Sequence, residues 1–261
     1  MPPEARRCAR AVIEYDGTAF AGSQRQPRQR TVQGELEDAL NKLTGERITV
    51  RFAGRTDAGV HATGQVIAFC LPSRPRGERI SWAELRRRLN AALTSDVVVR
   101  ALRSAPPGFD PRREATMRTY RYRIREGGDR RPTDRHRTLE IPDHLDVAAM
   151  SDAAARLVGE RDFAALGSDP RGQTDRHLMA VTVRRRGTLV EVTVTGNAFL
   201  RRMVRSLVAV LLAVGRGQMA PAEVERVLEA RQRALHGRAV QACGLTLERI
   251  SFERTGDVNR T

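Results

Sequence analysis

A short run of side chains that could do chemistry lies in residues 52–69, FAGRTDAGVHATGQVIAF, which hold Arg55, Asp57 and His61. An arginine can pair with a carboxylate, and an aspartate with a histidine forms part of a metal site where further ligands lie nearby. The flanking apolar residues predict two strands, and Asp-Ala-Gly at 57–59 has the residue types of a tight turn. A loop held between two core strands is where a rigid scaffold presents reactive groups.

The same run also has a purely structural interpretation. Asp57 could bond the backbone two residues further on, while Gly59 allows a positive φ. Arg55 could pair with a surface carboxylate, an interaction that contributes little. His61 fits a hydrogen-bonding turn residue better than a ligand, because no further metal ligands are evident. From this stretch alone, the reactive and the structural interpretations both stay open.

Residues 117–125 (MRTYRYRIR) predict a strand that could supply partners of matching chemistry. Side chains alternate between the two faces of a strand. One face is then part core and part aromatic platform, and it carries Arg118, Tyr120, Tyr122 and Ile124. The other face is solvated or meets phosphates, and it carries Thr119, Arg121, Arg123 and Arg125. We expect one of the two tyrosines to be a core residue with a bonded hydroxyl.

A second possible partner is Arg205, in the segment AFLRRMVRSLVAVLLAVG. The segment predicts a helix over about residues 199–214 that ends at Gly215, with arginines in its first half and apolar residues all round afterwards. Arg205 borders the point where burial starts, and a charge there needs a partner. The alternative is an arginine that lies along an exposed face and keeps its charged end in water.

The charge of the chain indicates a polyanionic partner. Its 261 residues include 46 basic and 31 acidic residues, giving a net charge of +15 and a pI near 11.3. Lys42 is the only lysine. A coding bias explains arginine in place of lysine, but it does not explain the excess of cations. Nucleic acid is the favoured partner over a membrane surface, since no basic amphipathic helix with an aromatic face is evident.

Compartment is indicated by hydropathy and by the cysteines. No run approaches the roughly 20 apolar residues of a membrane span, and MPPEARRCAR at the N-terminus has no apolar signal region. The three cysteines, Cys8, Cys70 and Cys243, are far apart and form no CxxC motif. Their odd number and spacing argue against a disulfide framework and a zinc site. We therefore expect a cytoplasmic protein in a reducing environment.

Strand, helix and strand follow one another in both halves of the chain. This order favours an α+β fold of two similar halves, each an antiparallel-rich sheet with helices packed on it. Thr31 and Ser81 predict the first residues of two helices, and Gly45 the end of the first. The expected organisation is a disordered tail over residues 1–9, an N-terminal half over 10–126 with the candidate loop, a basic linker loop over 127–138, a C-terminal half over 139–252 and a tail over 253–261.

The candidate loop resembles a known signature. The stretch AGRTDAGVHATGQV, at residues 53–66, is similar to the catalytic signature of the tRNA pseudouridine synthase A (TruA) family. Further segments resemble family segments in the same order along nearly the whole chain: EYDGTAFAGSQRQ, TVQGELEDAL, LNAALTSDVVV, RTYRYRI, NAFLRRMVRSLV and GLTLERISF.

The resemblance implies the pseudouridine synthase fold, with a catalytic cleft between the two halves. It implies an isomerase that converts uridine to pseudouridine at positions 38, 39 and 40 of the tRNA anticodon stem-loop. The bond from the sugar C1′ to uracil N1 is broken, the base turns, and C1′ is joined to C5. The resemblance further implies that no metal, nucleotide or organic cofactor takes part. It also implies a homodimer whose tRNA contacts span both subunits.

Carried over residue by residue, the resemblance gives roles to the side chains above. Asp57 matches the essential aspartate, which acts as a nucleophile or as a base on the sugar. Arg205 matches the basic residue that pairs with the aspartate and favours its ionised form. Tyr120 matches the tyrosine that stacks on the target base. Arg55 matches the arginine that enters the base stack when the target base flips out.

Two positions depart from the family pattern. Ser23 stands in GSQRQ where the family commonly has tryptophan, and Arg113 stands where it tends to be aromatic. A serine cannot stack or fill the volume of an indole, so we expect the change to affect RNA contacts and substrate range. We expect neither change to touch the catalytic set.

Two other functions fit part of these observations. A catalytically silent tRNA-binding or folding protein would share the charge but would not need Asp57. A basic hydrolase that uses Asp57 and His61 with a metal would lose its activity with a chelator. A pseudouridine synthase would be indifferent to the chelator, apart from effects of magnesium on tRNA folding.

Overall fold

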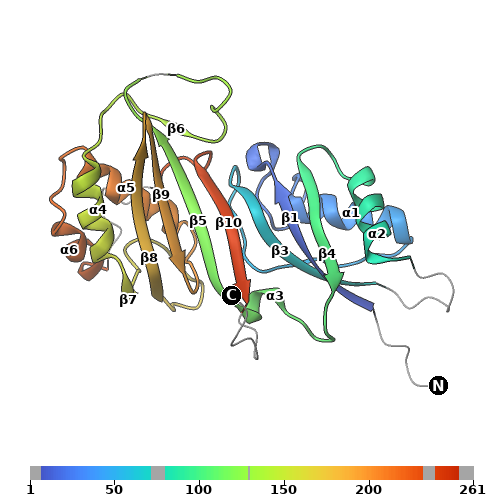
Figure 1. Cartoon of the computed structure of the whole chain (residues 1–261). Coiled ribbons are helices and arrows are strands. Elements are labelled where there is room, and N and C mark those ends of the chain that lie inside the picture. The colour runs from blue at the N-terminus through green and yellow to red at the C-terminus, as the bar shows by residue number, and fades with distance from the viewer. Residues whose placement is uncertain (1–6, 72–79, 129, 232–238, 253–261) are drawn as a thin grey trace, which may run out of the picture. The chain divides into compact units, whose positions relative to one another are not determined.

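The chain divides into two compact units, which are described one at a time (Figure 1). The structure is a computed structural model and describes residues 7–71, 80–128, 130–231 and 239–252. The first unit comprises Met1–Thr116 and Arg249–Thr261, and the second comprises Met117–Glu248. The basic loop at 127–138 thus lies inside the second unit and is not the junction that we expected. The division instead precedes Met117, because β5 (Ala115–Arg125) pairs from Arg118 onward with β9 (Leu189–Gly196) of the second unit.

The sheet of the first unit is antiparallel and has β1 at its centre. β1 (Arg7–Tyr15) pairs with β3 (His61–Leu71) on one side and with β4 (Val97–Ser104) on the other, while the short β2 (Arg51–Phe52) pairs with β3. β1 begins at Arg7 rather than at residue 10, because Arg7 is already paired with Leu71. Residues 7–9 therefore belong to a strand and not to the expected tail, whereas residues 1–6 lie outside the described residues.

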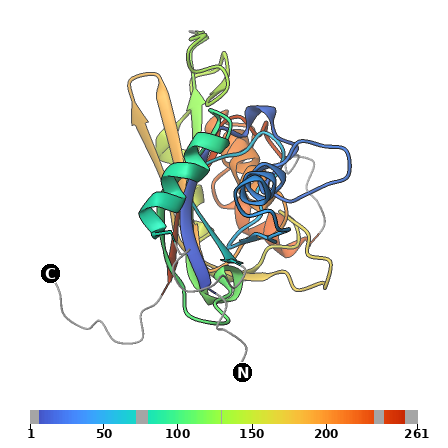
Figure 2. The ribbon, with the colours of Figure 1, turned by 90° about the vertical axis from the view of Figure 1, so that its right-hand side faces the viewer.

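Two helices cover this sheet, and both begin where the sequence predicted. α1 (Val32–Thr44) starts after Thr31, whose hydroxyl accepts the Gly34 amide, and ends at Gly45 with a φ of 75°. α2 (Trp82–Ala92) starts after Ser81, whose hydroxyl accepts the Glu84 amide. α2 packs against β4 and lies beside α1; Figure 2 looks nearly along the axis of α1. Two short helical segments, Gly17–Ala19 (η1) and α3 (Pro111–Glu114), were not predicted.

The second unit is built on a mostly antiparallel sheet with the strand order β10, β5, β9, β8 and β7. β8 (Asp175–Arg186) and β9 (Leu189–Gly196) form a hairpin around Gly187. β7 (Gly159–Asp162) pairs with β8, and β6 (Leu139–Glu140) pairs in parallel with the end of β5. The first residues of β10 (Leu245–Phe252) complete this sheet beside β5. Together the two units form the predicted α+β fold.

Three helices pack in the second unit: α4 (Val147–Arg156), α5 (Met203–Gly215) and α6 (Glu223–Glu229). α4 lies against β8, α5 and α6. α5 begins at Met203 and not near residue 199, because Arg202 has a φ of 64° and Arg201 forms a bridge with Ser168. Every residue of α5 except Arg205 and Ala209 is buried, as its apolar sequence predicts. Within the described residues, no helix is both long and apolar enough to cross a membrane.

Cys8 and Cys70 form a disulfide, which contradicts our expectation from cysteine number and spacing. The two residues are direct partners in the register of β1 and β3. They are 62 positions apart in the chain, so only strand pairing brings them together. Cysteine usage therefore gives no support to a reducing environment.

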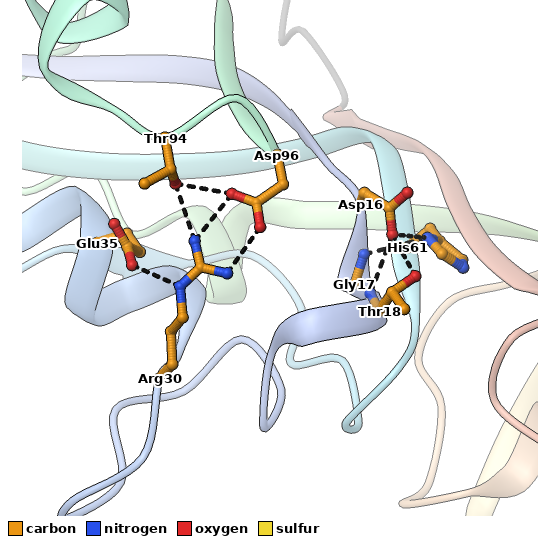
Figure 3. A network of polar contacts seen from close by, with 8 residues as sticks. All are labelled: Asp16, Gly17, Thr18, Arg30, Glu35, His61, Thr94 and Asp96. Atoms are coloured by element: carbon orange, nitrogen blue, oxygen red, sulfur yellow. Dashed lines mark hydrogen bonds and ion pairs between the residues drawn. The ribbon is translucent and has the colours of Figure 1, made fainter. Parts of the chain in front are cut away.

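Arg30 joins three segments of the first unit (Figure 3). Its guanidinium donates to both carboxylate oxygens of Asp96 at 2.7 and 2.9 Å, to Glu35 at 2.7 Å and to Thr94 at 2.9 Å. It also lies 4.2 Å from the ring centre of Phe20. The hydrogen bond from Arg30 holds the pKa of Asp96 below its usual value. The network ties the segment before α1 to the segment before β4.

Arg30→Met is expected to lower the free energy of unfolding near neutral pH by about 1 kcal/mol, after allowance for solvent screening. An aspartate with a lowered folded-state pKa adds stability above its unfolded pKa, and that stability is lost as the pH falls through the folded pKa. The deficit of the variant should therefore shrink as the pH falls below about 4. Urea unfolding near neutral pH and again below about pH 4 measures this deficit in the free energy of unfolding. Arg87→Met, which removes an exposed partner of Glu84, is the control, and an equal deficit there would contradict the prediction.

Candidate active site

The loop between β2 and β3 carries Arg55 and Asp57. β2 and β3 are antiparallel, with Phe52 opposite Ile67, and the amide of Ala53 donates to the Val66 carbonyl at 2.9 Å. The turn closes through a hydrogen bond of 3.2 Å from the Val60 amide to the Asp57 carbonyl, and Gly59 has a φ of 77°. The predicted strand, turn and strand are thus confirmed. Arg55 is exposed and Asp57 is half-buried, so both side chains can meet a ligand.

Buried hydroxyl groups of Tyr15 and Ser23 anchor the loop. The Tyr15 hydroxyl lies 2.8 Å from the Thr56 hydroxyl, and the Thr56 amide donates to the Ser23 side-chain oxygen at 2.8 Å. Burial raises the pKa of Tyr15 to about 12, so its hydroxyl keeps its proton at neutral pH. The Gln65 side chain donates to the Gly54 carbonyl at 2.7 Å. The backbone on both sides of Thr56 is therefore fixed to the first unit.

Two glycines allow the segment after β1 to approach the loop closely. A Cβ on Gly17 would lie 2.0 Å from the Val60 carbonyl oxygen. A Cβ on Gly22 would lie 2.9 Å from the Thr56 carbonyl oxygen, and Gly22 has a φ of 104°. Neither position has room for a side chain, and the φ of Gly22 is one that other residues rarely adopt. Close backbone packing thus adds to the hydrogen bonds that hold the loop.

His61 is a buried structural residue at the start of β3 (Figure 3). Its Nδ1 lies 3.1 Å from the Gly17 amide nitrogen and 3.2 Å from an oxygen of Asp16. An unprotonated Nδ1 accepts from Gly17, and a protonated one donates to Asp16, so only one bond forms at a time. Either bond holds η1 against β3, in agreement with the interpretation of His61 as a hydrogen-bonding residue. Among the described residues, no group of three or more His, Cys, Asp or Glu is placed to hold a metal.

The two tyrosines of β5 lie on one face of the strand, as predicted, and both are buried. Tyr122 is fully buried, and its hydroxyl donates to the Gln241 carbonyl at 2.7 Å. It is the core tyrosine with a bonded hydroxyl that we expected, and burial raises its pKa. The Tyr120 ring contacts Phe199 edge to face, with ring centres 5.1 Å apart. Phe199 thereby fixes the orientation of Tyr120.

On the opposite face of β5, the predicted solvated side chains Thr119, Arg121 and Arg123 are half-buried, but Arg125 is not. Arg125 was expected to be solvated, but it is 5% exposed. Its guanidinium lies 2.5 Å from a carboxylate oxygen of Asp134 and 3.1 Å from the Thr188 hydroxyl. The segment at 130–138 supplies this carboxylate, which alternation along a strand cannot reveal.

Arg205 lies in the first turn of α5 and is half-buried. Its Nε donates to the Val240 carbonyl at 2.7 Å, and the Val240 amide donates to the Arg205 carbonyl at 3.3 Å. The expectation that Arg205 borders the buried region and needs a partner is confirmed. One partner of Arg205 in the second unit is therefore a backbone carbonyl, which a search for acidic side chains would miss.

The four site residues that the sequence pointed to belong to two units. Arg55 and Asp57 lie in the first, and Tyr120 and Arg205 lie in the second. The pairing of Arg205 with Asp57 and the cleft between the halves stay predictions. Of the two departures, Arg113 is exposed in α3, while Ser23 is buried and bonded to the residue before Asp57. The expectation that neither change touches the catalytic set stays a prediction, although Ser23 contacts the neighbour of Asp57.

Comparison with known proteins defines the class to which this fold and this loop belong. A family model described as tRNA pseudouridine synthase matches residues 11–109 and 153–253. These ranges, more than half of the chain, include Arg55, Asp57 and Arg205, whereas Tyr120 lies between them. The chain belongs to the tRNA pseudouridine synthase family.

Curated relatives carry a more specific name, tRNA pseudouridine synthase A. The protein of that name from Frankia casuarinae is 45% identical over 249 residues, which are 93% of this chain and 88% of that protein. The one from Thermotoga petrophila is 41% identical over 244 residues, 93% of this chain and 98% of that protein. The one from Geobacter sulfurreducens is 39% identical over 253 residues, 94% and 100% of the two chains. The resemblance read from the motifs is therefore confirmed.

Proposed function

We propose that this protein converts uridine to pseudouridine in tRNA, at positions 38, 39 and 40 of the anticodon stem-loop. The observation that carries the proposal is the half-buried Asp57 on a loop that buried hydrogen bonds hold in place. The family match and the names of the curated relatives support the reaction and the class of RNA. The excess of positive charge fits a polyanionic substrate.

The reaction is an isomerisation, so its atoms balance without a co-reactant. The bond between C1′ and N1 breaks, C1′ and C5 are joined, C5 loses its proton and N1 gains one. Asp57 either attacks an electrophilic carbon of the nucleotide or takes a proton from the sugar. Both roles require a carboxylate that is held in one direction beside the sugar. The fixed backbone around Thr56 provides that rigidity.

The other three residues assist in distinct ways. Tyr120 stacks on the target base, and Phe199 sets the orientation of its ring. The exposed side chain of Arg55 enters the space that the flipped base leaves, which lowers the cost of unstacking. Arg205 places a cation beside the Asp57 carboxylate and favours its ionised form. The protein acts as a cytoplasmic homodimer and uses no metal or organic cofactor.

Mapping of pseudouridine tests the reaction and its sites. Unmodified tRNA transcripts are incubated with wild type and with Asp57→Ala, without cofactor and with or without a chelator, then treated with carbodiimide and analysed by primer extension. We expect stops in the anticodon stem-loop with wild type only, and no effect of the chelator beyond tRNA folding. Tight binding without stops would favour the silent tRNA-binding protein, and stops that disappear with the chelator while the tRNA stays folded would mean that the conversion needs a metal.

Binding of tRNA is expected to weaken steeply with salt. Each phosphate that the protein neutralises releases counterions, so the logarithm of the binding constant falls linearly with that of the salt concentration. We expect the affinity to fall at least about tenfold between roughly 50 and 200 mM salt. Filter binding of a tRNA transcript over this range measures the slope. A flat dependence would mean that phosphate contacts do not dominate.

A further inference from the structure

Ser23 makes hydrogen bonds with both the carbonyl and the amide of Thr56, the residue before Asp57. Its backbone amide donates to the Thr56 carbonyl at 3.1 Å, and its side-chain oxygen accepts the Thr56 amide at 2.8 Å. The Thr56 carbonyl belongs to the peptide bond that joins Thr56 to Asp57. Ser23 is 1% exposed and Thr56 is 8% exposed, so water does not replace these bonds.

The serine hydroxyl stands in for a backbone acceptor. In an antiparallel pair, two opposed residues exchange both hydrogen bonds through the main chain. Here the Ser23 carbonyl accepts the Gln33 amide of α1 at 3.0 Å. The Ser23 hydroxyl oxygen therefore accepts the Thr56 amide in place of that carbonyl. A residue without an acceptor would leave the buried Thr56 amide unsatisfied. Alanine has no acceptor, and the indole of tryptophan offers only a donor.

The segment that carries Ser23 is itself anchored. The Val32 amide of α1 donates to the Gly22 carbonyl at 3.3 Å. The backbone of Gly22 lies so close to the Thr56 carbonyl that a Cβ there would be 2.9 Å from its oxygen. A continuous path of short contacts therefore runs from the start of α1 through Ser23 to Thr56, and the carboxylate of Asp57 is one residue further on.

We propose that Ser23 is a positioning residue for Asp57, acting through the backbone of Thr56 and making no contact with the substrate. The inference rests on the proposed function, because the direction of the carboxylate matters only where Asp57 reacts with a nucleotide. A displacement of a reacting group by about 1 Å can lower a rate by about 100-fold. Loss of the Ser23 hydroxyl should thus affect the chemical step and leave tRNA binding unchanged.

Ser23→Ala tests this role with single-turnover kinetics. With enzyme in excess over tRNA labelled with tritium at uridine C5, we expect the rate of tritium release to fall about 10- to 100-fold. The Kd for tRNA, from filter binding, should change less than about twofold. Ser23→Thr keeps the hydroxyl and should restore most of the rate. Ser81→Ala is the matched control, because its hydroxyl also accepts a backbone amide in the first unit but serves α2.

Hydrogen exchange supplies a readout that does not depend on activity. Amides of residues 54–60 should exchange faster in Ser23→Ala, while those of α2 keep their wild-type rates. Unchanged tritium release and unchanged exchange in Ser23→Ala would overturn the proposal, as would equal losses in rate and in tRNA affinity. If wild type releases no tritium, the proposed function fails, and exchange of the loop amides still decides whether Ser23 holds the loop.

Discussion

Asp57→Asn is expected to reduce pseudouridine formation by at least about 1,000-fold, while the fold and the tRNA affinity stay close to wild type. An amide of the same shape is neither a useful nucleophile nor a base. The hydrogen bond that closes the turn uses the Asp57 carbonyl, which the substitution keeps. The hydrogen bonds that Thr56 makes with Tyr15 and with Ser23 are also unaffected. The loss should therefore be chemical and not conformational.

Tritium release and filter binding with the same tRNA transcript measure the two quantities. Asp38→Asn is a matched control, since it makes the same chemical change at an exposed carboxylate of α1 that pairs with Arg25. This control should react at the wild-type rate. Conversion by Asp57→Asn near the wild-type rate would refute the role of the carboxylate. It would favour the interpretation in which Asp57 is only a turn residue.

Arg205→Met is expected to lower the rate of conversion about 100-fold, with a loss in tRNA affinity of no more than about fivefold. The expectation rests on the proposed pairing of Arg205 with Asp57, which favours the ionised carboxylate and sets its orientation. Methionine keeps much of the stem of the side chain but removes the cation and its bond to the Val240 carbonyl. Because most phosphate contacts remain, binding should suffer less than chemistry.

The control for this change is Arg216→Met, just after the C-terminal end of α5. Arg216 pairs with Asp143 through its Nε at 2.8 Å, so the same type of substitution removes one cation from the same part of the chain. It should leave the rate near wild type. Equal losses of rate and affinity in Arg205→Met would identify Arg205 as an RNA-binding residue and not a partner of Asp57. Thermal unfolding of both variants separates these effects from a loss of stability.

Much of the secondary structure was predictable because its causes are local. Thr31, Ser81 and Asp146 each accept a backbone amide at the start of a helix, which residue type and spacing are enough to indicate. The turn after Asp57 and the hairpin at Gly187 likewise follow from residues that tolerate positive φ. Alternation along β5 placed both tyrosines on one face, and Tyr122 is the one whose buried hydroxyl has the expected partner.

The errors share one physical cause, which is contact between residues that belong to different segments of the chain. α5 begins at Met203 because Arg201 pairs with Ser168 and Arg202 turns the backbone. Arg125 is buried because a later loop supplies Asp134. The division between the units lies near Met117 because β5 pairs with β9, and the composition of the loop at 127–138 does not reveal that pairing.

For the candidate site, the sequence by itself determined the family, the loop and the four residues proposed to act. A matched run of adjacent residues is a local property, and it requires no knowledge of packing. Only the tertiary structure decided that Cys8 meets Cys70, that Val240 is a partner of Arg205 and that Ser23 holds Thr56. Each of these contacts depends on the register of strands or on the close approach of two segments. The spacing of residues along the sequence reveals neither.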